Sequence, residues 1–534
     1  MLRWCQRSSI VRNIWRAVGG VVSCHALLGT IPLARNKNYL SEFLGAFMQS
    51  LSPRRSTPVT AFLSALAAAL PVLISSYSSE SFAVPAFARQ TGQNCVACHA
   101  GGQFPELTPY GRIFKLTGYT LGERTIPLSA MAVVSYTKTN NTNDPNGDKK
   151  TDFPKNGNLV FTTASIFLAG KITDNIGGFA QGTVDQYDHT DDNGNWKSKS
   201  HTDNIDLRYA DRFIDTSHDL IFGLTLNNNP SVQDVWNSAP AWGFDVVPGS
   251  LSPLGLPSGP QLAGGLGQQV VGIGAYAYWN KMIYAELSAY KTADKFWSFM
   301  SSGNKFSDGS LNRLAGTTPY WRLALTKDWG AHNVMVGAMG LSANIHNDPN
   351  DPASPTTHYR DVGVDGQYQY ILDPHTVTAQ VSYIHERIHY DSSVAGQPGA
   401  YDAAIGTTLQ PLTNSSDTLK LFRAKTSYVY RATYGGSLSY FNLNGSFNSL
   451  NQLGVPGDPT QGGALPSVTG TNVTGKPNTT GGIGEIFWIP VQYARVGLQY
   501  SMFSKYLGAS KNYDGYGRDA KDNNTLFLYV WGAY

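Results

Sequence analysis

The stretch Ala494-Arg-Val-Gly-Leu-Gln-Tyr-Ser-Met502 alternates between two kinds of side chain. Its alanine, valine, leucine, tyrosine and methionine share one face of an extended strand, and its arginine, glycine, glutamine and serine share the other. An apolar face opposite a polar one, over about ten residues, is typical of a strand in a membrane-spanning barrel with a polar interior. The stretch therefore predicts one strand of such a barrel.

The same alternation recurs from about residue 128 to the end of the chain, for example in residues 321–326 and 377–383. The last stretch ends on Tyr534, and many outer-membrane barrels end on an aromatic residue. About sixteen stretches of this kind are predicted, starting near residues 128, 157, 175, 202, 219, 271, 282, 319, 332, 359, 375, 419, 433, 481, 492 and 524. The predicted fold is all-β, an outer-membrane β-barrel over residues 128–534.

The connections between these stretches alternate in length. Those after even-numbered strands are tight, whereas those after odd-numbered strands are long, and residues 229–270 form the longest. Bacterial outer-membrane barrels join their strands by short periplasmic turns and long external loops. The pattern therefore puts the residues before the first strand on the periplasmic side. A barrel of this size has an open lumen into which the longest loop could fold, and it could form oligomers, including trimers.

The composition agrees with a surface that is not all in water. Apolar residues make up 41% of the 534 residues and charged residues 14%, whereas soluble proteins carry about 25% charged residues. The formal net charge of +3 is too small to indicate a nucleic-acid partner.

The N-terminal region is typical of an export signal. Arg54-Arg55 is basic, residues 59–74 are apolar, and Ser81-Phe82-Ala83 supplies small residues for cleavage before Val84. The predicted parts are a signal and pre-region (1–83, of which 1–47 is a candidate mis-assigned start), a haem-binding segment (84–127) and the barrel (128–534).

The haem-binding assignment comes from the cysteines. Cys5 and Cys24 lie in the part expected to be removed, which leaves Cys95-Val-Ala-Cys98-His99. This is the pattern for covalent attachment of a c-type haem: the two thiols add across the haem vinyl groups, and the adjacent histidine becomes the proximal ligand of the iron. One covalent haem c is predicted.

Other interpretations of the motif are weaker. A structural zinc site needs four ligands, and a thioredoxin-like pair belongs to a βαβ unit, for which there is no pattern here. A disulfide between the two cysteines is the main competitor.

The segment around the motif predicts a short helix over residues 109–117, with Thr108 as N-cap, Pro109 in the first turn and Gly118 just past the end. Because so short a segment cannot bury a haem alone, we expect it to fold into the lumen as a plug; a loosely tethered periplasmic module is the alternative. Arg112 and Lys115 could meet the haem propionates or simply face solvent. The candidates for the haem environment are Phe87, Arg89, Phe104, Arg112, Phe114 and Lys115.

The sixth iron position has no obvious ligand within residues 84–127. Weak candidates from the barrel are Met131, Met335, Met339 and His385; water or an open position is the alternative. Loop carboxylates could gather Fe(II), which accepts such ligands, although such a cluster is more often simply a solvated loop. These residues are Asp185, Asp188, Asp191 and Asp192.

The haem segment resembles the fused cytochrome c–porin family of outer-membrane iron oxidases. The matching positions are Phe87, Ala88, Arg89, Gln90, Thr91, Gly92, Cys95, Cys98, His99, Phe104, Pro105, Leu107, Gly111, Arg112, Phe114, Lys115, Gly118 and Tyr119, and a second match runs from Leu226 to Phe244. The small insert Ala100–Gln103 departs from the pattern.

The resemblance implies transfer of electrons from an extracellular donor, Fe(II) in this family, to a periplasmic cytochrome or other electron carrier, and so an oxidoreductase role. Two alternatives stay open: a transport porin with a haem plug, and a haem peroxidase or ligand sensor.

Overall fold

The computed structural model describes residues 85–103, 105–141, 157–190, 196–239, 259–303, 312–391, 401–402, 407–408, 414–448, 472–515 and 517–534. The chain divides into two units, residues 1–76 and 77–534, and every described residue belongs to the second. The predicted signal and its cleavage before Val84 lie outside the described residues.

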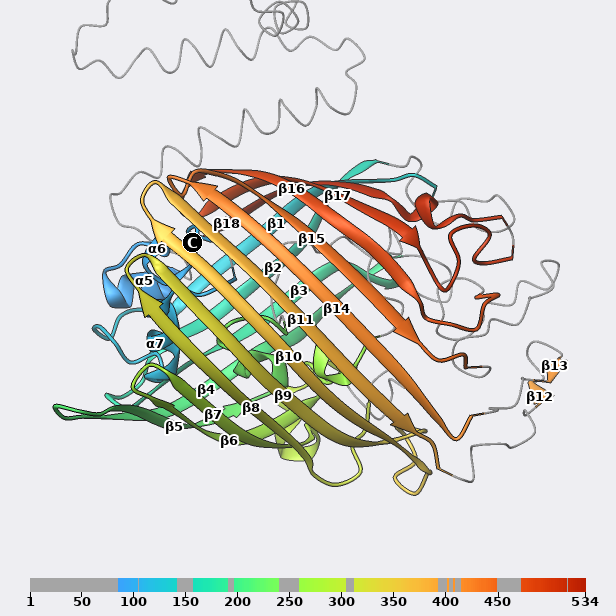
Figure 1. Cartoon of the computed structure of the whole chain (residues 1–534), viewed down its shortest axis with the longest axis horizontal. Coiled ribbons are helices and arrows are strands. Elements are labelled where there is room, and N and C mark those ends of the chain that lie inside the picture. Colours follow the sequence, from blue (N-terminus) through green and yellow to red (C-terminus); the bar gives the residue numbers. More distant parts are fainter. Residues whose placement is uncertain are drawn as a thin grey trace, which may run out of the picture. The chain divides into compact units, whose positions relative to one another are not determined.

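Sixteen antiparallel strands form a closed barrel, in which each strand pairs with its neighbours in sequence order and β18 pairs with β1 (Figure 1). The strands are β1 (Leu128–Thr139), β2 (Asn158–Lys171), β3 (Ile176–Thr190), β4 (Trp196–Ile214), β5 (Asp219–Asn227), β6 (Val270–Trp279), β7 (Ile283–Thr292), β8 (Thr318–Trp329), β9 (His332–His346), β10 (Thr356–Leu372), β11 (His375–His389), β14 (Ser416–Tyr430), β15 (Tyr434–Gly445), β16 (Thr479–Val491), β17 (Ala494–Lys505) and β18 (Thr525–Ala533). Two short strands, β12 (Tyr401–Asp402) and β13 (Thr407–Thr408), pair separately.

The predicted barrel and its strand number are confirmed. Each predicted start lies within three residues of an observed one except that of β4, which begins at Trp196 rather than near residue 202. The early part of β4 reads Trp-Lys-Ser-Lys-Ser-His and has no run of apolar residues on one face, so alternation could not reveal it.

The two faces of the barrel differ in the sense expected for a bilayer. Leu438 is 74% exposed on the outside, and Leu287 and Ile486 are each 66% exposed. Arg208 and Arg495, by contrast, are fully buried inside. Soluble monomers rarely expose a continuous apolar surface, whereas membrane barrels have an apolar outer band and a polar interior. No helix among the described residues is long and apolar enough to cross a membrane, a finding that does not bear on strands.

The N-terminal helices α5 (Pro85–Thr91), α6 (Cys95–Cys98) and α7 (Pro109–Leu116) lie within the barrel. The Arg112 guanidinium in α7 donates to the side-chain oxygens of Asn333 on β9 (2.7 Å) and Gln369 on β10 (3.0 Å). The Tyr276 hydroxyl on β6 donates to the carbonyl of Leu116 (2.8 Å). The segment thus contacts inward-facing residues of three strands and occupies the lumen.

The predicted helix is confirmed to within its last residue. The Thr108 side chain caps it by accepting from the Gly111 amide at 3.1 Å, and Pro109 needs no hydrogen bond in the first turn. Gly118 follows the helix with φ +72°, a left-handed conformation that glycine adopts without strain. Local sequence therefore determines both ends of α7.

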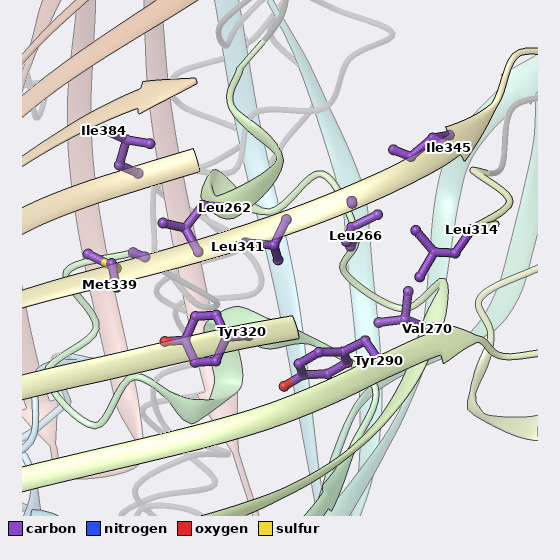
Figure 2. Packing of buried hydrophobic residues seen from close by; sticks show 12 residues of the cluster. Leu262, Leu266, Val270, Tyr290, Leu314, Tyr320, Met339, Leu341, Ile345 and Ile384 are labelled. Carbon is purple, nitrogen blue, oxygen red and sulfur yellow. The ribbon is translucent and has the colours of Figure 1, made fainter. Parts of the chain in front are cut away.

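A second segment inside the barrel comes from the connection between β5 and β6. It includes α8 (Pro230–Gln233), the fully buried Trp236, and the short 3-10 helix η1 (Gln261–Ala263). Figure 2 shows Leu262 and Leu266 packed with Leu341 of β9 and other inner-wall side chains. The described parts of the longest loop thus fold into the lumen, as the sequence suggested.

Carboxylates on the wall also hold this segment. The amide of Gln261 donates to Glu386 Oε2 at 2.7 Å, and the amide of Leu262 donates to Asp361 Oδ2 at 2.6 Å. The remaining short helices are η2 (Lys295–Met300), after β7, and η3 (Ala520–Asn523), before β18.

Candidate functional site

A cavity of about 500 Å³ lies between the N-terminal segment and the barrel wall. Cys95, Cys98 and His99 line it on the side of the segment. Its wall includes inward-facing residues of four consecutive strands: Phe527, Tyr529 and Trp531 on β18, Met131 and Val133 on β1, Phe167 on β2, and Phe179 and Gln181 on β3. The volume lies within the range of about 300–1,000 Å³ that is usual for small-molecule sites.

The motif is fixed to the turn between β16 and β17. Gln492 in this turn accepts from the Cys95 amide through its side-chain oxygen (3.3 Å) and from the Cys95 thiol through its carbonyl oxygen (3.3 Å). The Gln103 side chain donates to the carbonyls of Gln492 and, at 3.4 Å, Ala494. Cys95 is therefore held against the end of the barrel that carries the short turns.

Helix α7 packs directly on the motif. A Cβ atom at Gly111 would lie 2.1 Å from the Cys98 carbonyl oxygen, so any side chain there would push the two helices apart. The amide of Thr108 donates to the same carbonyl at 2.9 Å. Glycine at this position is thus required for α7 and α6 to meet.

The two thiols are shielded from water to different extents, Cys95 being buried and Cys98 half-buried. They are not joined in a disulfide. Burial raises the pKa of Cys95 to about 12 and that of Cys98 to about 11, whereas reactive cysteines have a lowered pKa. Among the described residues, no group of three or more His, Cys, Asp or Glu side chains is placed to hold a metal ion.

The predicted aromatic residues Phe87 and Phe114 both line the cavity. Their rings lie edge to face with centroids 5.1 Å apart, and Phe87 also stacks on Tyr119 at 5.2 Å. Such pairs are stabilising beyond the area that they bury. The result is an apolar aromatic wall beside the motif, which suits the flat apolar ring of a haem.

Two basic candidates do not face the cavity, and the solvent-facing alternative for Arg112 is wrong. The Arg112 side chain is only 3% exposed, and its guanidinium is hydrogen-bonded to side chains of the barrel wall. Arg89 donates to the carbonyls of Ile126 and Leu128, and so ties α5 to the start of β1. Phe104 lies outside the described residues.

Lys115 does line the cavity, and it too is buried rather than solvated. Its ammonium group donates to the Val232 carbonyl. Burial lowers the pKa of Lys115 from 10.5 to about 8. The charged groups near it are Arg208, Asp206, Asp234 and Glu286. Lys115 thus places a buried basic group at the edge of the cavity, where the Val232 carbonyl holds it.

Replacing Lys115 with Met should change how stability depends on pH. Below pH 8 the lysine is protonated in both states, so the folded protein carries the full cost of burying a charge. Between about pH 8 and 10.5 the folded state loses this proton first, so stability rises with pH. We expect the advantage of K115M over wild type to be largest below this window and to shrink across it. Denaturant unfolding on either side of the window measures the difference; a pH-independent difference would contradict it.

Replacing Thr108 with Ala should loosen α7 on the motif, because the Thr108 side chain accepts from the Gly111 amide and donates to the Ala97 carbonyl. Loss of an N-cap costs about 1 kcal/mol. T108S keeps the hydroxyl and is the matched control. Denaturant unfolding should separate T108A from T108S and wild type, and equal midpoints for all three proteins would show that the cap contributes nothing.

Of the four predicted distal candidates, Met131 alone lines the cavity. Met335 and Met339 are buried in apolar clusters elsewhere on the inner wall, Met335 with Trp236. His385 shares the outward parity of Val381 and Tyr383 on β11. These three residues are therefore corrected to packing or outer-surface positions.

The predicted acidic residues divide in the same way. Asp185 lines the cavity, and its carboxylate lies 3.9 Å from the His201 imidazole. Asp188 belongs to β3, but its side chain lies outside the described part of the chain, as do Asp191 and Asp192 entirely.

The residues that hold the motif and close the cavity carry no signal in the local sequence. No local pattern marks Gln103, in the insert Ala100–Gln103, or Gln492 as residues that hold the motif. Trp531 and Tyr529 lie on the inward face of the last strand. Strand parity could have placed the two aromatic residues inside, but no local signal shows that they meet the motif.

No family profile matches this chain. A search of curated proteins also finds no match. Solved structures give similarities over the barrel: the outer membrane channel DcaP of Acinetobacter baumannii (15% identity, 76% of this chain and 96% of that chain, TM-score 0.40), OmpF of Salmonella typhi in complex with daunomycin (10%, 76% and 97%, 0.39), and an anion-selective porin from Comamonas acidovorans (8%, 76% and 98%, 0.37).

Proposed function

We propose that this chain is an outer-membrane monohaem cytochrome that transfers electrons from an extracellular donor, with Fe(II) as the expected one, to a periplasmic electron carrier. The observation that carries the proposal is the cavity into which Cys95, Cys98 and His99 all open. A covalently bound haem would supply a one-electron couple inside the barrel. The proposal makes the chain an oxidoreductase whose redox group is enclosed by the lumen.

The position of the motif within the barrel supports this direction of transfer. Gln492, which binds the motif, lies in a short turn, and short turns face the periplasm in bacterial outer-membrane barrels. Asp185 lines the same cavity and lies on β3 nine residues after its start at Ile176. The cavity therefore extends from the turn end toward the loops, which would face outward.

The residues of the chain have defined tasks in this proposal. Cys95 and Cys98 would hold the haem, and His99 would ligate its iron. Phe87 and Phe114 form apolar walls that exclude water, and a drier surrounding strengthens electrostatic interactions inside the site. Lys115 lines the same cavity, and its positive charge would favour an anionic propionate nearby.

Two observations weigh against a freely conducting transport porin. Helix α7 is anchored across the lumen by Arg112, and the β5–β6 connection buries Trp236 completely within it. Both segments occupy space that an open channel would need. A transport porin should show measurable ion conductance in planar bilayers. Our proposal predicts little conductance, because both segments occupy the lumen.

The test is an anaerobic reduction. The protein is expressed with cytochrome c maturation machinery, purified from outer membranes, oxidised and mixed with a ferrous salt. Rapid appearance of the reduced haem bands is expected. Covalent haem that stays oxidised with Fe(II) would exclude iron as the donor, and absence of covalent haem would overturn the proposal.

A further inference from the structure

The inner wall of the cavity contains a thioether sulfur to which the proposed function assigns no role. Met131 on β1 shares its inward parity with Val133 and Ser135, and it lines the cavity together with Cys95, Cys98 and His99. Among the described residues that line this cavity, His99 is the only imidazole and Met131 the only thioether.

The register of the strands brings this thioether close to the motif. Gln103, four residues after His99, donates to the Ala494 carbonyl. Ala494 pairs with Gly532 on β18, and Gly532 pairs with Ala132 on β1. Neighbouring strands lie about 4.8 Å apart, so Ala494 on β17 and Ala132 on β1 are separated by about 10 Å. Met131, adjacent to Ala132, therefore borders the cavity at the level where the motif is anchored.

The Met131 side chain is also held in place. The indole nitrogen of Trp531 on β18 donates to its sulfur at 3.4 Å, and Trp531 lines the cavity beside it. A thioether sulfur has a second lone pair, which this hydrogen bond leaves available. Met is otherwise a flexible side chain, so the contact limits the positions that the sulfur can take.

The other cavity groups of a kind that binds haem iron are committed elsewhere. Haem iron in proteins takes His, Cys, Met or Tyr as axial ligand. The hydroxyl of Tyr119 donates to Asp206 at 2.6 Å, and the hydroxyl of Tyr529 donates to Glu485 at 2.5 Å. Both phenol hydroxyls are thus hydrogen-bonded to buried carboxylates of the barrel.

We propose that Met131 is the second axial ligand of the haem iron, opposite His99, with Trp531 as a positioning residue. This inference rests on the proposed function, because it requires a covalent haem in the cavity. Methionine–histidine ligation raises the reduction potential of a c-type haem. It also fills the position that peroxide or a diatomic ligand would need, and so it argues against the peroxidase and sensor alternatives.

The test uses the purified full-length haem protein and three variants: M131L, which keeps the volume, M131H, which offers a different ligand, and M335L as a matched inner-wall control. The denatured haem spectrum first reports covalent haem in each. The oxidised native proteins are then examined for the weak near-infrared absorption band of a thioether bound to ferric haem, and the midpoint potential is measured.

Wild type and M335L should show the thioether band, M131L should lose it, and M131H should give a low-spin spectrum with a lower midpoint potential. A wild type that carries covalent haem but lacks the band, or an M131L that keeps it, overturns the ligand assignment alone. Absence of covalent haem in wild type overturns the proposed function. If M131L does not fold, M131H decides: an unchanged thioether band in that variant overturns the assignment.

Discussion

Replacing both Cys95 and Cys98 with Ala is expected to abolish covalent haem while leaving the barrel folded. The thioether bonds need both sulfur atoms, and no other cysteine lies among the described residues. The barrel closes through the pairing of β1 with β18, in which neither cysteine takes part. Haem staining of denatured protein should fall to background, and the folded barrel should still migrate differently from the heated protein in detergent gels.

The matched control for this variant is V96A. Val96 lies between the two cysteines in α6 but is 45% exposed and does not line the cavity. Its replacement should leave the covalent haem content of the protein unchanged. Covalent haem in the double cysteine variant would contradict the assignment of the motif, and loss in V96A would mean that the helix rather than the thiols determines attachment.

Replacing Arg322 with Met should cause the largest loss of stability among single changes at the inner wall. Its guanidinium lies 2.6 Å from Asp365 and 3.2 Å from Asp234, and all three side chains are fully buried. Removing the cation leaves two buried carboxylates without their partner, which costs about 3–5 kcal/mol. Because Asp234 belongs to the β5–β6 segment, we also expect this segment to loosen and ion conductance to rise.

Denaturant unfolding followed by tryptophan fluorescence measures the first effect. The triple variant R322M/D234N/D365N removes all three charges and should recover much of the loss, because neutral replacement of a buried ion pair is often tolerated. K521M at the exposed pair with Asp519 should change the free energy of unfolding by less than about 1 kcal/mol. An R322M protein as stable as K521M would contradict the importance of this network.

The barrel could be predicted because the signal for a strand is local. Alternation within ten residues decides which side chains point outward, as the outward series Val377, Ala379, Val381 and Tyr383 shows. His385 continues this series, so strand parity alone places it on the outer face, away from the lumen.

The interior could not be predicted in the same way, because it depends on contacts between distant segments. Arg112 and Lys115 lie on a short helix that resembles a solvated one, yet both side chains are buried. Met335 and Met131 share inward parity on their strands, but the β5–β6 segment covers Met335, whereas the cavity leaves Met131 accessible. The motif is recognisable from adjacent residues, whereas the tertiary structure determines which wall residues meet it.

The central claim is that a haem held in the lumen carries electrons across the membrane. The most direct measurement places the protein in vesicles that enclose an oxidised soluble cytochrome c, and then adds a membrane-impermeant ferrous complex outside. The account predicts rapid reduction of the enclosed cytochrome with wild type and none with the C95A/C98A barrel. No reduction with wild type, or equal reduction through the haem-free barrel, would contradict it.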